Sequence, residues 1–430
     1  MNKNIKLAVA GAVLALSASA ANAGIVIPAG EWTVDIGGNV NMYSSWSKTK
    51  GLNDINGGLI GSSTTKQTTT NGMGNGLLPN FLSVSGSTRQ NDLDVSFTIS
   101  LQPGSANNSA VSGVHNAGFS DNLGGLNNRQ SFITFGDKSW GSVKVGKDLG
   151  IFASDAILSD ITLLGVGGAA AGGGNTSLGR IGFGYIYADW KPQIAYTTPN
   201  MSGFQATVGI SQAFLATGAE TTANGTYSND PASATAKLTN KGLTSGSNNA
   251  SVAYEGKASY AFNANGVDGK IWVSGIAQRV GSFGAYGNDD TLAYAGDIGA
   301  KVSAAGFDLV GYYYGGSGVG TTGQFLNGYG FKAGSTVLEA RDSQGGYVQA
   351  AYTLPTKTKV ALSWGRSQLD NSGTAITSLV DTNDMWDAML IHPLTKHLNL
   401  VAEYSNQQSE AHSGVKNTAN VGSVGAILFF

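Results

Sequence analysis

Residues 93–101 (LDVSFTISL) alternate strictly between apolar side chains and short polar ones. Successive side chains of a strand point to opposite faces, so this segment has one apolar and one polar face over about 30 Å. The same two-residue period recurs along the chain, and no long apolar helix follows the N-terminal segment. The pattern predicts an all-β protein whose strands contact water on one face and either a core or lipid on the other.

Short turns and long loops alternate between about sixteen predicted strands. The first strand covers residues 32–42, and the next two meet at the polar turn 89–92. The other predicted strands are 127–136, 140–147, 186–198, 203–214, 250–263, 267–280, 291–303, 306–315, 343–354, 358–369, 382–392, 396–408 and 420–430. The predicted loops are 49–78, 103–127, 148–185, 215–249 and 316–342.

This arrangement of connections favours a membrane barrel over a globular sandwich. Outer-membrane barrels have an even number of antiparallel strands, short periplasmic turns and long extracellular loops. In hydrocarbon every backbone N–H and C=O must be paired, so a sheet crosses the membrane only as a closed barrel. We therefore predict a closed antiparallel transmembrane β-barrel of about 16 strands, with both ends of the chain on the periplasmic side.

Charged residues fall on the polar faces of these strands, where a water-filled lumen tolerates them and a dry core would not. Strand 267–280 is less regular, because Trp272 and Ile276 share a face with Lys270. The predicted lumen-wall residues are Lys144, Glu255, Lys257, Asp297, Lys301 and Glu403.

Aromatic residues lie near the ends of the predicted strands, as they do in the interfacial girdles of outer-membrane barrels. They are Tyr43, Trp46, Trp140, Trp190, Trp386, Phe429 and Phe430. The chain also ends within a strand, on whose apolar face Leu428 and Phe430 lie. A terminal strand that must close a barrel against the first strand has a reason to end in this way.

The N-terminal segment has the features of an export signal. Lys3 and Lys6 precede an apolar run over 7–16, and residues 21–23 read Ala-Asn-Ala. The run is short for a membrane span. We expect residues 1–23 to be a cleaved signal peptide and residues 24–430 to form a single barrel domain.

Composition narrows the function further. The 430 residues include no Cys, which excludes disulfides and thiolate chemistry. Without residues 1–23 the chain has 23 basic and 27 acidic residues and a net charge of −4, so it has no basic field for nucleic acid. Glycine, at 63 residues, is about twice as frequent as usual, but it is interleaved with aromatics in patterned strands rather than in disordered tracts.

Sequence motifs of enzymes and cofactor sites are missing or explained by chance. The chain has no G-x-S-x-G, and none of its G-K pairs continues into a P-loop. Residues 328–333 match a degenerate dinucleotide pattern in a Gly-rich predicted loop, and His392 and His397 have no zinc-site spacing. We predict no enzymatic activity, no cofactor and no metal site; solvated charge explains the loop aspartates better than Ca²⁺ binding does.

Three segments together resemble those of the Gram-negative general porins, which are sixteen-stranded trimeric outer-membrane diffusion channels. Residues 128–136 (NRQSFITFG) with 140–147 (WGSVKVGK) resemble the fourth and fifth porin strands. Residues 194–204 (IAYTTPNMSGF) resemble the junction of the sixth and seventh strands. Leu428 and Phe430, in the terminal LFF, resemble the signal that the barrel-assembly machinery reads.

The resemblance implies that the third external loop, residues 148–185, folds into the lumen and narrows the pore. It also implies that acids of this loop face a basic cluster on the wall. The candidate constriction residues are Asp148, Asp155, Asp160, Lys147, Arg180, Lys191 and Arg129. Strict alternation would turn Lys147 and Arg129 toward lipid, unless the strands bulge there or both residues lie at the rim and contact lipopolysaccharide phosphates.

The resulting hypothesis is a passive channel for small hydrophilic solutes and ions in the cell outer membrane. Its expected partners are the lipid bilayer, lipopolysaccharide, the barrel-assembly machinery and two further copies in a homotrimer. A substrate-selective porin of the same fold is the first alternative, and the long loops leave room for it. A secreted β-rich adhesin is the second, although the chain shows no internal repeats. A barrel hydrolase is the weakest, because no suitable Ser/His arrangement is present.

Overall fold

The computed structural model describes residues 24–61, 67–105, 126–168, 175–214, 252–280, 291–331, 338–371 and 377–430. The predicted signal peptide and the predicted loop 215–249 lie outside these residues. The strands are β1 (Ile25–Ala29), β2 (Trp32–Lys50), β3 (Gln67–Gly74), β4 (Phe81–Gln90), β5 (Leu93–Pro103), β6 (Leu126–Asp137), β7 (Gly141–Leu149), β8 (Trp190–Thr197), β9 (Phe204–Gln212), β10 (Val252–Ala264), β11 (Val267–Val280), β12 (Thr291–Ala304), β13 (Phe307–Ser317), β14 (Tyr329–Phe331), β15 (Leu338–Ala340), β16 (Asp342–Thr353), β17 (Lys359–Leu369), β18 (Val380–Pro393), β19 (Leu398–Ala411) and β20 (Lys416–Phe429). Two short helical segments, α1 (Ser154–Ser159) and a 3-10 helix (Ile161–Leu164), lie between β7 and β8.

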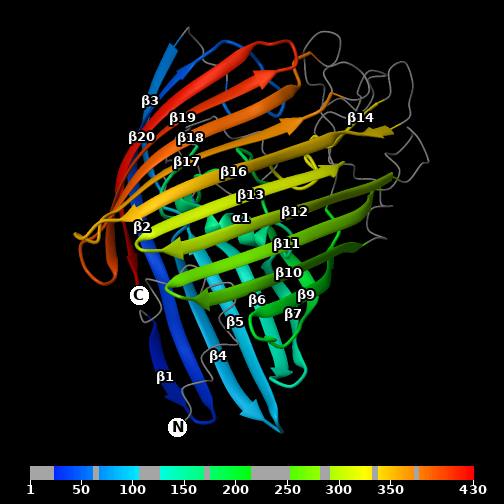
Figure 1. Cartoon of the computed structure of the whole chain (residues 1–430), viewed down its shortest axis with the longest axis vertical. Coiled ribbons are helices and arrows are strands. Elements are labelled where there is room, and N and C mark those ends of the chain that lie inside the picture. The colour runs from blue at the N-terminus through cyan, green and yellow to red at the C-terminus, as the bar shows by residue number, and fades with distance from the viewer. Residues whose placement is uncertain are drawn as a thin grey trace.

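Eighteen of these strands form one antiparallel sheet that closes on itself (Figure 1). β3 and β4 pair with successive parts of β2 and together occupy one strand position of the barrel. β1 only extends the sheet below the end of β20. The barrel therefore has sixteen strand positions, as predicted. β20 closes the ring against β2, where Gly38 N donates to Phe430 O at 2.8 Å and Phe430 N donates to Gly38 O at 3.0 Å.

The alternation that predicted the strands separates two environments. In β5, Ile99 is 49% exposed on the outer face, whereas the neighbouring Thr98 and Ser100 are buried on the inner face. Hydrocarbon solvates the apolar face, while the polar face finds partners inside the barrel. Among the described residues, no helix is both long enough and apolar enough to cross a membrane.

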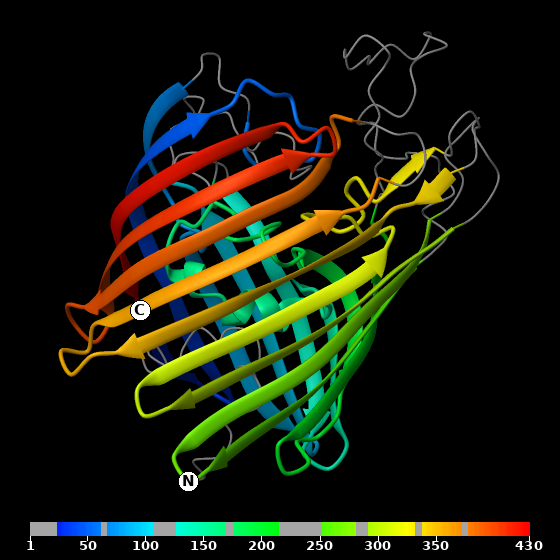
Figure 2. The same ribbon diagram turned by 45° about the horizontal axis from the view of Figure 1, so that its top comes forward.

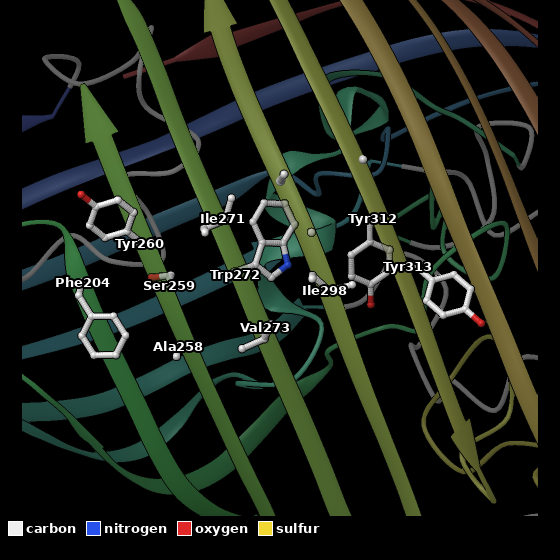
Figure 3. Close-up of a pocket in the computed structure, with 13 residues that line it drawn as sticks. Phe204, Ala258, Ser259, Tyr260, Ile271, Trp272, Val273, Ile298, Tyr312 and Tyr313 are labelled. Carbon is white, nitrogen blue, oxygen red and sulfur yellow. The ribbon is translucent and has the colours of Figure 1, made fainter. Parts of the chain in front are cut away.

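The outer face of β10–β13 shows the same separation in a close view (Figure 3). Ile271, Val273 and Ile298 are about half exposed around a shallow apolar depression of about 520 Å³, while Trp272 and Tyr312 on the same strands are buried on the inner side. Apolar side chains outside and large buried side chains inside indicate that this part of the lumen is filled, and the inner loop described below fills it.

The second strand position, formed by β3 and β4, was only half predicted. β2 continues to Lys50, and the predicted loop 49–78 contains β3, which pairs with the upper half of β2. Apart from Met73, the sequence of β3, QTTTNGMG, is polar or small on both faces, so it gives no alternating signal. β1 was not predicted either.

Two further boundaries were wrong. β8 begins at Trp190 rather than at 186, because Ile186 and Ala188 are fully buried and Tyr187 N donates to Thr322 O of another loop at 2.8 Å. The last external connection covers only residues 412–415, so the alternation of long and short connections fails there.

The predicted aromatic girdle is partly wrong. Trp46, Trp140 and Trp386 are 50%, 38% and 42% exposed on the outside, as interfacial side chains should be. Tyr43 and Phe429, however, are 1% and 7% exposed and lie in an interior cluster. Nearness to a strand end does not distinguish the two faces of a strand.

Candidate functional site: the inner loop and the charged lumen wall

The inner loop (residues 148–185) leaves β7 and turns into the barrel, where α1 lies inside the ring of strands (Figures 1 and 2). Ala156 and Ile157 of α1 pack with Trp272 and Ile276 in one buried cluster. Lys270, which shares their face, lies farther toward the short turns. The irregular face of β11 is thus explained: its apolar positions support the loop and its lysine faces the lumen.

The near anchor of the loop consists of Asp155, Lys257 and Lys270. Lys257 Nζ lies 3.0 Å from one oxygen of Asp155, and Lys270 contacts the other oxygen. Burial would raise the pKa of the Asp155 carboxyl, but the two ammonium groups outweigh burial and hold that pKa below its ordinary value. The carboxylate therefore stays ionised at neutral pH and cross-links α1 to two strands of the wall.

Asp148 begins the inner loop and is fully buried. It contacts Lys144 of the same strand and accepts a hydrogen bond from Gln130 Nε2 at 3.0 Å. The negative charge of Asp148 is therefore balanced by Lys144 at the point where the loop leaves β7.

Glu255 of β10 receives the first residues of the loop. One carboxylate oxygen accepts from Ile151 N and Phe152 N, both at 2.9 Å. The other oxygen is held by Lys191 Nζ at 2.7 Å, and both charged side chains are buried. A carboxylate that accepts backbone N–H groups fixes the direction of the chain, which is a structural role.

The middle of the loop is held by a second buried ion pair. Arg180 Nε lies 3.5 Å from Asp160, and both side chains are fully buried. Asp160 also accepts from Thr162 N at 3.0 Å and Tyr185 OH at 2.9 Å, and Arg180 donates to Ser363 of β17. Burial, and then the charge of Asp160, raise the pKa of Tyr185, so its hydroxyl remains a donor.

Glu403 of β19 holds the loop on the opposite side of the lumen. Its carboxylate accepts from Val166 N at 2.6 Å and Gly167 N at 2.9 Å, and Tyr43 OH donates to Leu164 O at 2.7 Å. We call Asp160, Arg180 and Glu403 with these partners the far anchor. The loop therefore crosses the lumen from β7 to β19, fixed by buried contacts at its far side.

Arg129 points inward despite the alternation that would turn it toward lipid. The register of β5 and β6 shifts between Ser100 and Gln102, which is the bulge that one of the sequence alternatives required. Arg129 is 8% exposed, donates to Asn175 of the inner loop at 3.3 Å and lies 5.9 Å from the Trp190 ring. Trp190 is therefore a partner of the loop and not part of an outer girdle.

Lys147 is not brought to the loop. It pairs in register with Ser131 and Pro192, which lie on the outward face of the sheet. No bulge intervenes between β6 and β7, so strict alternation holds. Lys147 therefore faces away from the lumen, and its prediction as a constriction residue was wrong.

The other predicted wall residues lie on inward faces. Asp297 is buried and accepts from Tyr312 OH at 3.1 Å. Lys301 is close enough to Asp308, Lys359 and Lys270 to interact with them electrostatically. Glu255 and Glu403 also face inward, but both are covered by the inner loop and are not presented to water.

Two external loops fold down onto this assembly. Leu59 N and Ile60 N donate to Ser409 Oγ at 3.0 and 3.1 Å, which attaches residues 51–61 to the wall. Gln324 accepts from Lys191 Nζ at 2.6 Å and donates to Tyr187 O at 3.1 Å. The extracellular end of the lumen is thus narrowed by more than the inner loop.

Sequence reasoning missed several residues of the candidate site. Lys270 and Lys359, and the Asp308 that lies 2.6 Å from Lys359 Nζ, were not proposed, although alternation along their strands would have placed all three inward. Ser363 and the other wall groups that bind the inner loop carry no sequence signal, because their role depends on the path of the loop. In the part of the chain that the structure describes, no group of three His, Asp or Glu is arranged to hold a metal ion.

A closed sixteen-stranded barrel with an apolar outside, a polar inside and an inward-folded loop defines an outer-membrane channel for passive diffusion. The chain belongs to the family of Gram-negative porins, whose model matches residues 10–412. Membership of this family and the barrel fold locate the protein in the cell outer membrane.

Solved structures show the same fold. The outer membrane channel DcaP of Acinetobacter baumannii is 16% identical, with a TM-score of 0.63 over 95% of this chain and 100% of that chain. The anion-selective porin from Comamonas acidovorans is 13% identical, with a TM-score of 0.57 over 93% of this chain and 100% of that chain. OmpF of Salmonella typhi is 12% identical, with a TM-score of 0.53 over 94% and 100%. Comparison with curated protein sequences gives no significant match.

Proposed function

We propose that the inner loop forms the narrowest part of the pore and that small hydrophilic solutes and ions pass between it and the charged wall of β10–β17. The observation that carries this proposal is the path of the loop across the lumen, fixed at Glu403 on one side and at Lys257 and Lys270 on the other. The side chains of Lys257 and Lys270 remain 25% and 38% exposed. A passive channel needs no further chemistry, so the porin family and the missing enzyme motifs both favour a channel over an enzyme.

Assembly and partners follow from the family resemblance. The predicted signal peptide directs export, and the terminal Phe430 with Leu428 is read by the barrel-assembly machinery. The protein forms a homotrimer in lipid, and basic side chains at the outer rim, Lys147 among them, contact lipopolysaccharide phosphates. Cross-linking of the purified protein, followed by gel electrophoresis, tests the trimer: a band at three times the monomer mass is expected.

The substrate-selective alternative has one specific observation in its favour. Residues 51–61 and 318–326 pack inside the extracellular end and contact the inner loop or its flanking residues, as Gln324 does with Lys191. Such packing reduces the routes open to a solute. A selective channel would show a current that one class of solute blocks and others do not.

Planar-bilayer recording tests the channel. The refolded, purified protein should give stable, ohmic current steps in KCl. Its mobility on an unboiled denaturing gel should change on heating, which shows that the barrel has folded. Folded protein that produces no current steps would contradict the proposal, and an unchanged mobility with water-soluble protein would favour the adhesin alternative.

A further inference from the structure

The strand position formed by β3 and β4 is interrupted at residues 75–80 (NGLLPN), which we call the inward segment. This segment contacts the inner loop through its backbone. Leu77 N donates to Gly165 O at 2.8 Å, and Gly76 O accepts from Ser177 N at 2.9 Å. A strand that leaves the sheet loses ladder hydrogen bonds, which is costly in a membrane protein, so other groups must replace them.

Asparagine side chains replace the missing ladder bonds. Asn41 of β2 donates through Nδ2 to Leu78 O at 3.0 Å, and its Oδ1 accepts from Gly76 N at 3.1 Å. Asn80 Oδ1 in turn accepts from Asn41 N at 2.7 Å. An Asn amide carries both donors and an acceptor, so it can take the place of a peptide group. The interruption is therefore stabilised by its own hydrogen bonds, and it carries Leu77 and Leu78 toward the inner loop.

The inward segment, the inner loop and β4–β6 enclose a cavity of about 80 Å³, which we call the apolar pocket. Its lining is mostly apolar and comes from both the wall and the loop, including Leu77, Leu78, Phe81, Ile157, Leu158 and Leu163. The volume is several times the roughly 15 Å³ that a single water molecule requires. The pocket is therefore large enough for part of a small organic molecule.

Several leucines of the apolar pocket are incompletely buried. Leu78, Leu158 and Leu178 pack against the interior cluster but are only partly buried. Attachment of the inner loop explains Leu77, which is 4% exposed, but it does not explain apolar surface that stays in contact with water. A solute whose apolar part enters the pocket would remove this surface from water.

A polar group among the lining residues lacks a partner. The indole N–H of Trp190 is buried and makes no hydrogen bond in the part of the chain that the structure describes. A buried donor without an acceptor costs free energy, and a ligand that supplies the acceptor recovers it. The neighbouring side chains already bind within the protein, since Arg129 donates to Asn175 and Gln130 donates to Asp148. Trp190 therefore offers the pocket a hydrogen-bond donor beside its apolar lining.

We propose that the apolar pocket binds small uncharged solutes that combine an apolar body of about one ring with a hydrogen-bond acceptor. The apolar body covers the leucines, and the acceptor binds the Trp190 N–H. The inference rests on the proposed channel function and gives the substrate-selective alternative a solute class. Binding depends on apolar area rather than on charge, so it persists at high ionic strength, where charge–charge attraction is screened.

Benzamide and acetamide test the solute class on the wild-type protein, without dependence on the folding of a variant. Both carry the same amide group, but only benzamide has an apolar ring. Saturation-transfer NMR on the folded, detergent-solubilised barrel in about 1 M KCl should show saturable binding of benzamide. Acetamide should bind at least about tenfold more weakly, because it has no ring to bury. In planar bilayers benzamide should reduce the ohmic current steps, and acetamide should leave them unchanged.

Two variants locate the binding in the apolar pocket. Leu158→Trp fills the pocket and should abolish the saturable binding of benzamide, whereas Leu390→Trp, at an outward position that is 49% exposed, should not. Trp190→Phe keeps an aromatic ring but removes the donor, so it should weaken binding by about fivefold, the factor for one net hydrogen bond. Trp386→Phe, on the outer face, serves as its control.

The outcomes separate the pocket from the channel. Equal binding of benzamide and acetamide to the wild type, or an unchanged benzamide affinity in a folded Leu158→Trp or Trp190→Phe barrel, would overturn the proposal. Ohmic channels that show any of these results leave the channel function intact. Folded protein that binds benzamide but gives no current steps would instead contradict the channel.

Discussion

The near and far anchors hold the same loop by different physical means. At the far anchor the charged side chains of Arg180, Asp160 and Glu403 are all buried. At the near anchor Asp155 meets lysines that are 25% and 38% exposed. Buried charges are costly to leave unpaired, whereas exposed pairs are screened and contribute little to stability. The far anchor therefore fixes the loop, and the near anchor remains available to solutes.

Removing the buried arginine should have the largest effect. Arg180→Met leaves Asp160 buried without its cation, at a cost of about 3 kcal/mol, the lower end of the range for broken buried pairs because Asp160 keeps three other hydrogen bonds. Guanidinium unfolding in lipid vesicles, followed by Trp fluorescence, measures the loss. The control Arg366→Met breaks an exposed pair with Asp384 and should cost less than about 1 kcal/mol. Equal losses would remove the distinction between buried and exposed pairs.

Glu403→Ala should come next. It leaves the N–H groups of Val166 and Gly167 without an acceptor, at a cost of about 2 kcal/mol, and frees the far side of the loop. The single-channel conductance should rise and fluctuate, because the loop no longer crosses the lumen in one position. Glu410→Ala on the same strand removes an exposed pair with Lys416 and serves as the control. A steady wild-type conductance in Glu403→Ala would show that the far anchor does not hold the loop.

A single hydrogen bond at the far anchor should have a smaller effect. Tyr43→Phe removes the donor to Leu164 O and should cost about 1 kcal/mol, because Tyr43 is buried and the bond is partly shielded from water. Tyr404→Phe, which removes an exposed bond to Asn420, should cost less in the same unfolding experiment. If Tyr404→Phe is the more destabilising of the two, burial does not set the strength of these contacts.

The near anchor should show the smallest effect on stability. Asp155→Asn should cost less than about 1 kcal/mol, because its lysines are partly solvated. The pKa of Asp155 is depressed, so its pairing contributes above the pKa of an unpaired aspartate, 3.8, and is lost as the pH falls through the lower folded value. Ion selectivity of the wild type should therefore stay constant from neutral pH down to that value and change only below it. Asp155→Asn should lack the acid transition, and a wild-type transition near neutral pH would contradict the assignment.

Alternation along the chain predicted most of the barrel for a definite reason. Each strand of a membrane barrel has lipid on one side and polar surroundings on the other, so a period of two residues is imposed along its whole length. The prediction failed where a segment does not show this two-sided pattern. Apart from Met73, β3 is polar or small on both faces, and residues 186–188 are apolar because they pack under another loop. Tyr43 and Phe429 were misplaced because an aromatic side chain fits either an interface or an interior cluster.

The candidate site was predicted unevenly for a related reason. Lys257, Lys301 and Glu403 follow from alternation alone, and the structure places them on the inner face. Arg129 required a bulge that the sequence allows but does not locate. Glu255 and Lys191 were named for the lumen, yet they bind each other and Glu255 also binds the loop backbone, because the path of a long loop depends on contacts far apart in sequence.

The sequence by itself determined that this protein is a membrane barrel. The hydrocarbon environment acts on every strand separately, so each strand shows the two-residue alternation of apolar and polar side chains. Only the tertiary structure decided which charges face water. That outcome depends on where residues 148–185 cross the lumen: the loop covers Glu255 and Glu403, buries its own Arg180, and leaves Lys257, Lys270, Lys301 and Lys359 partly exposed along one wall.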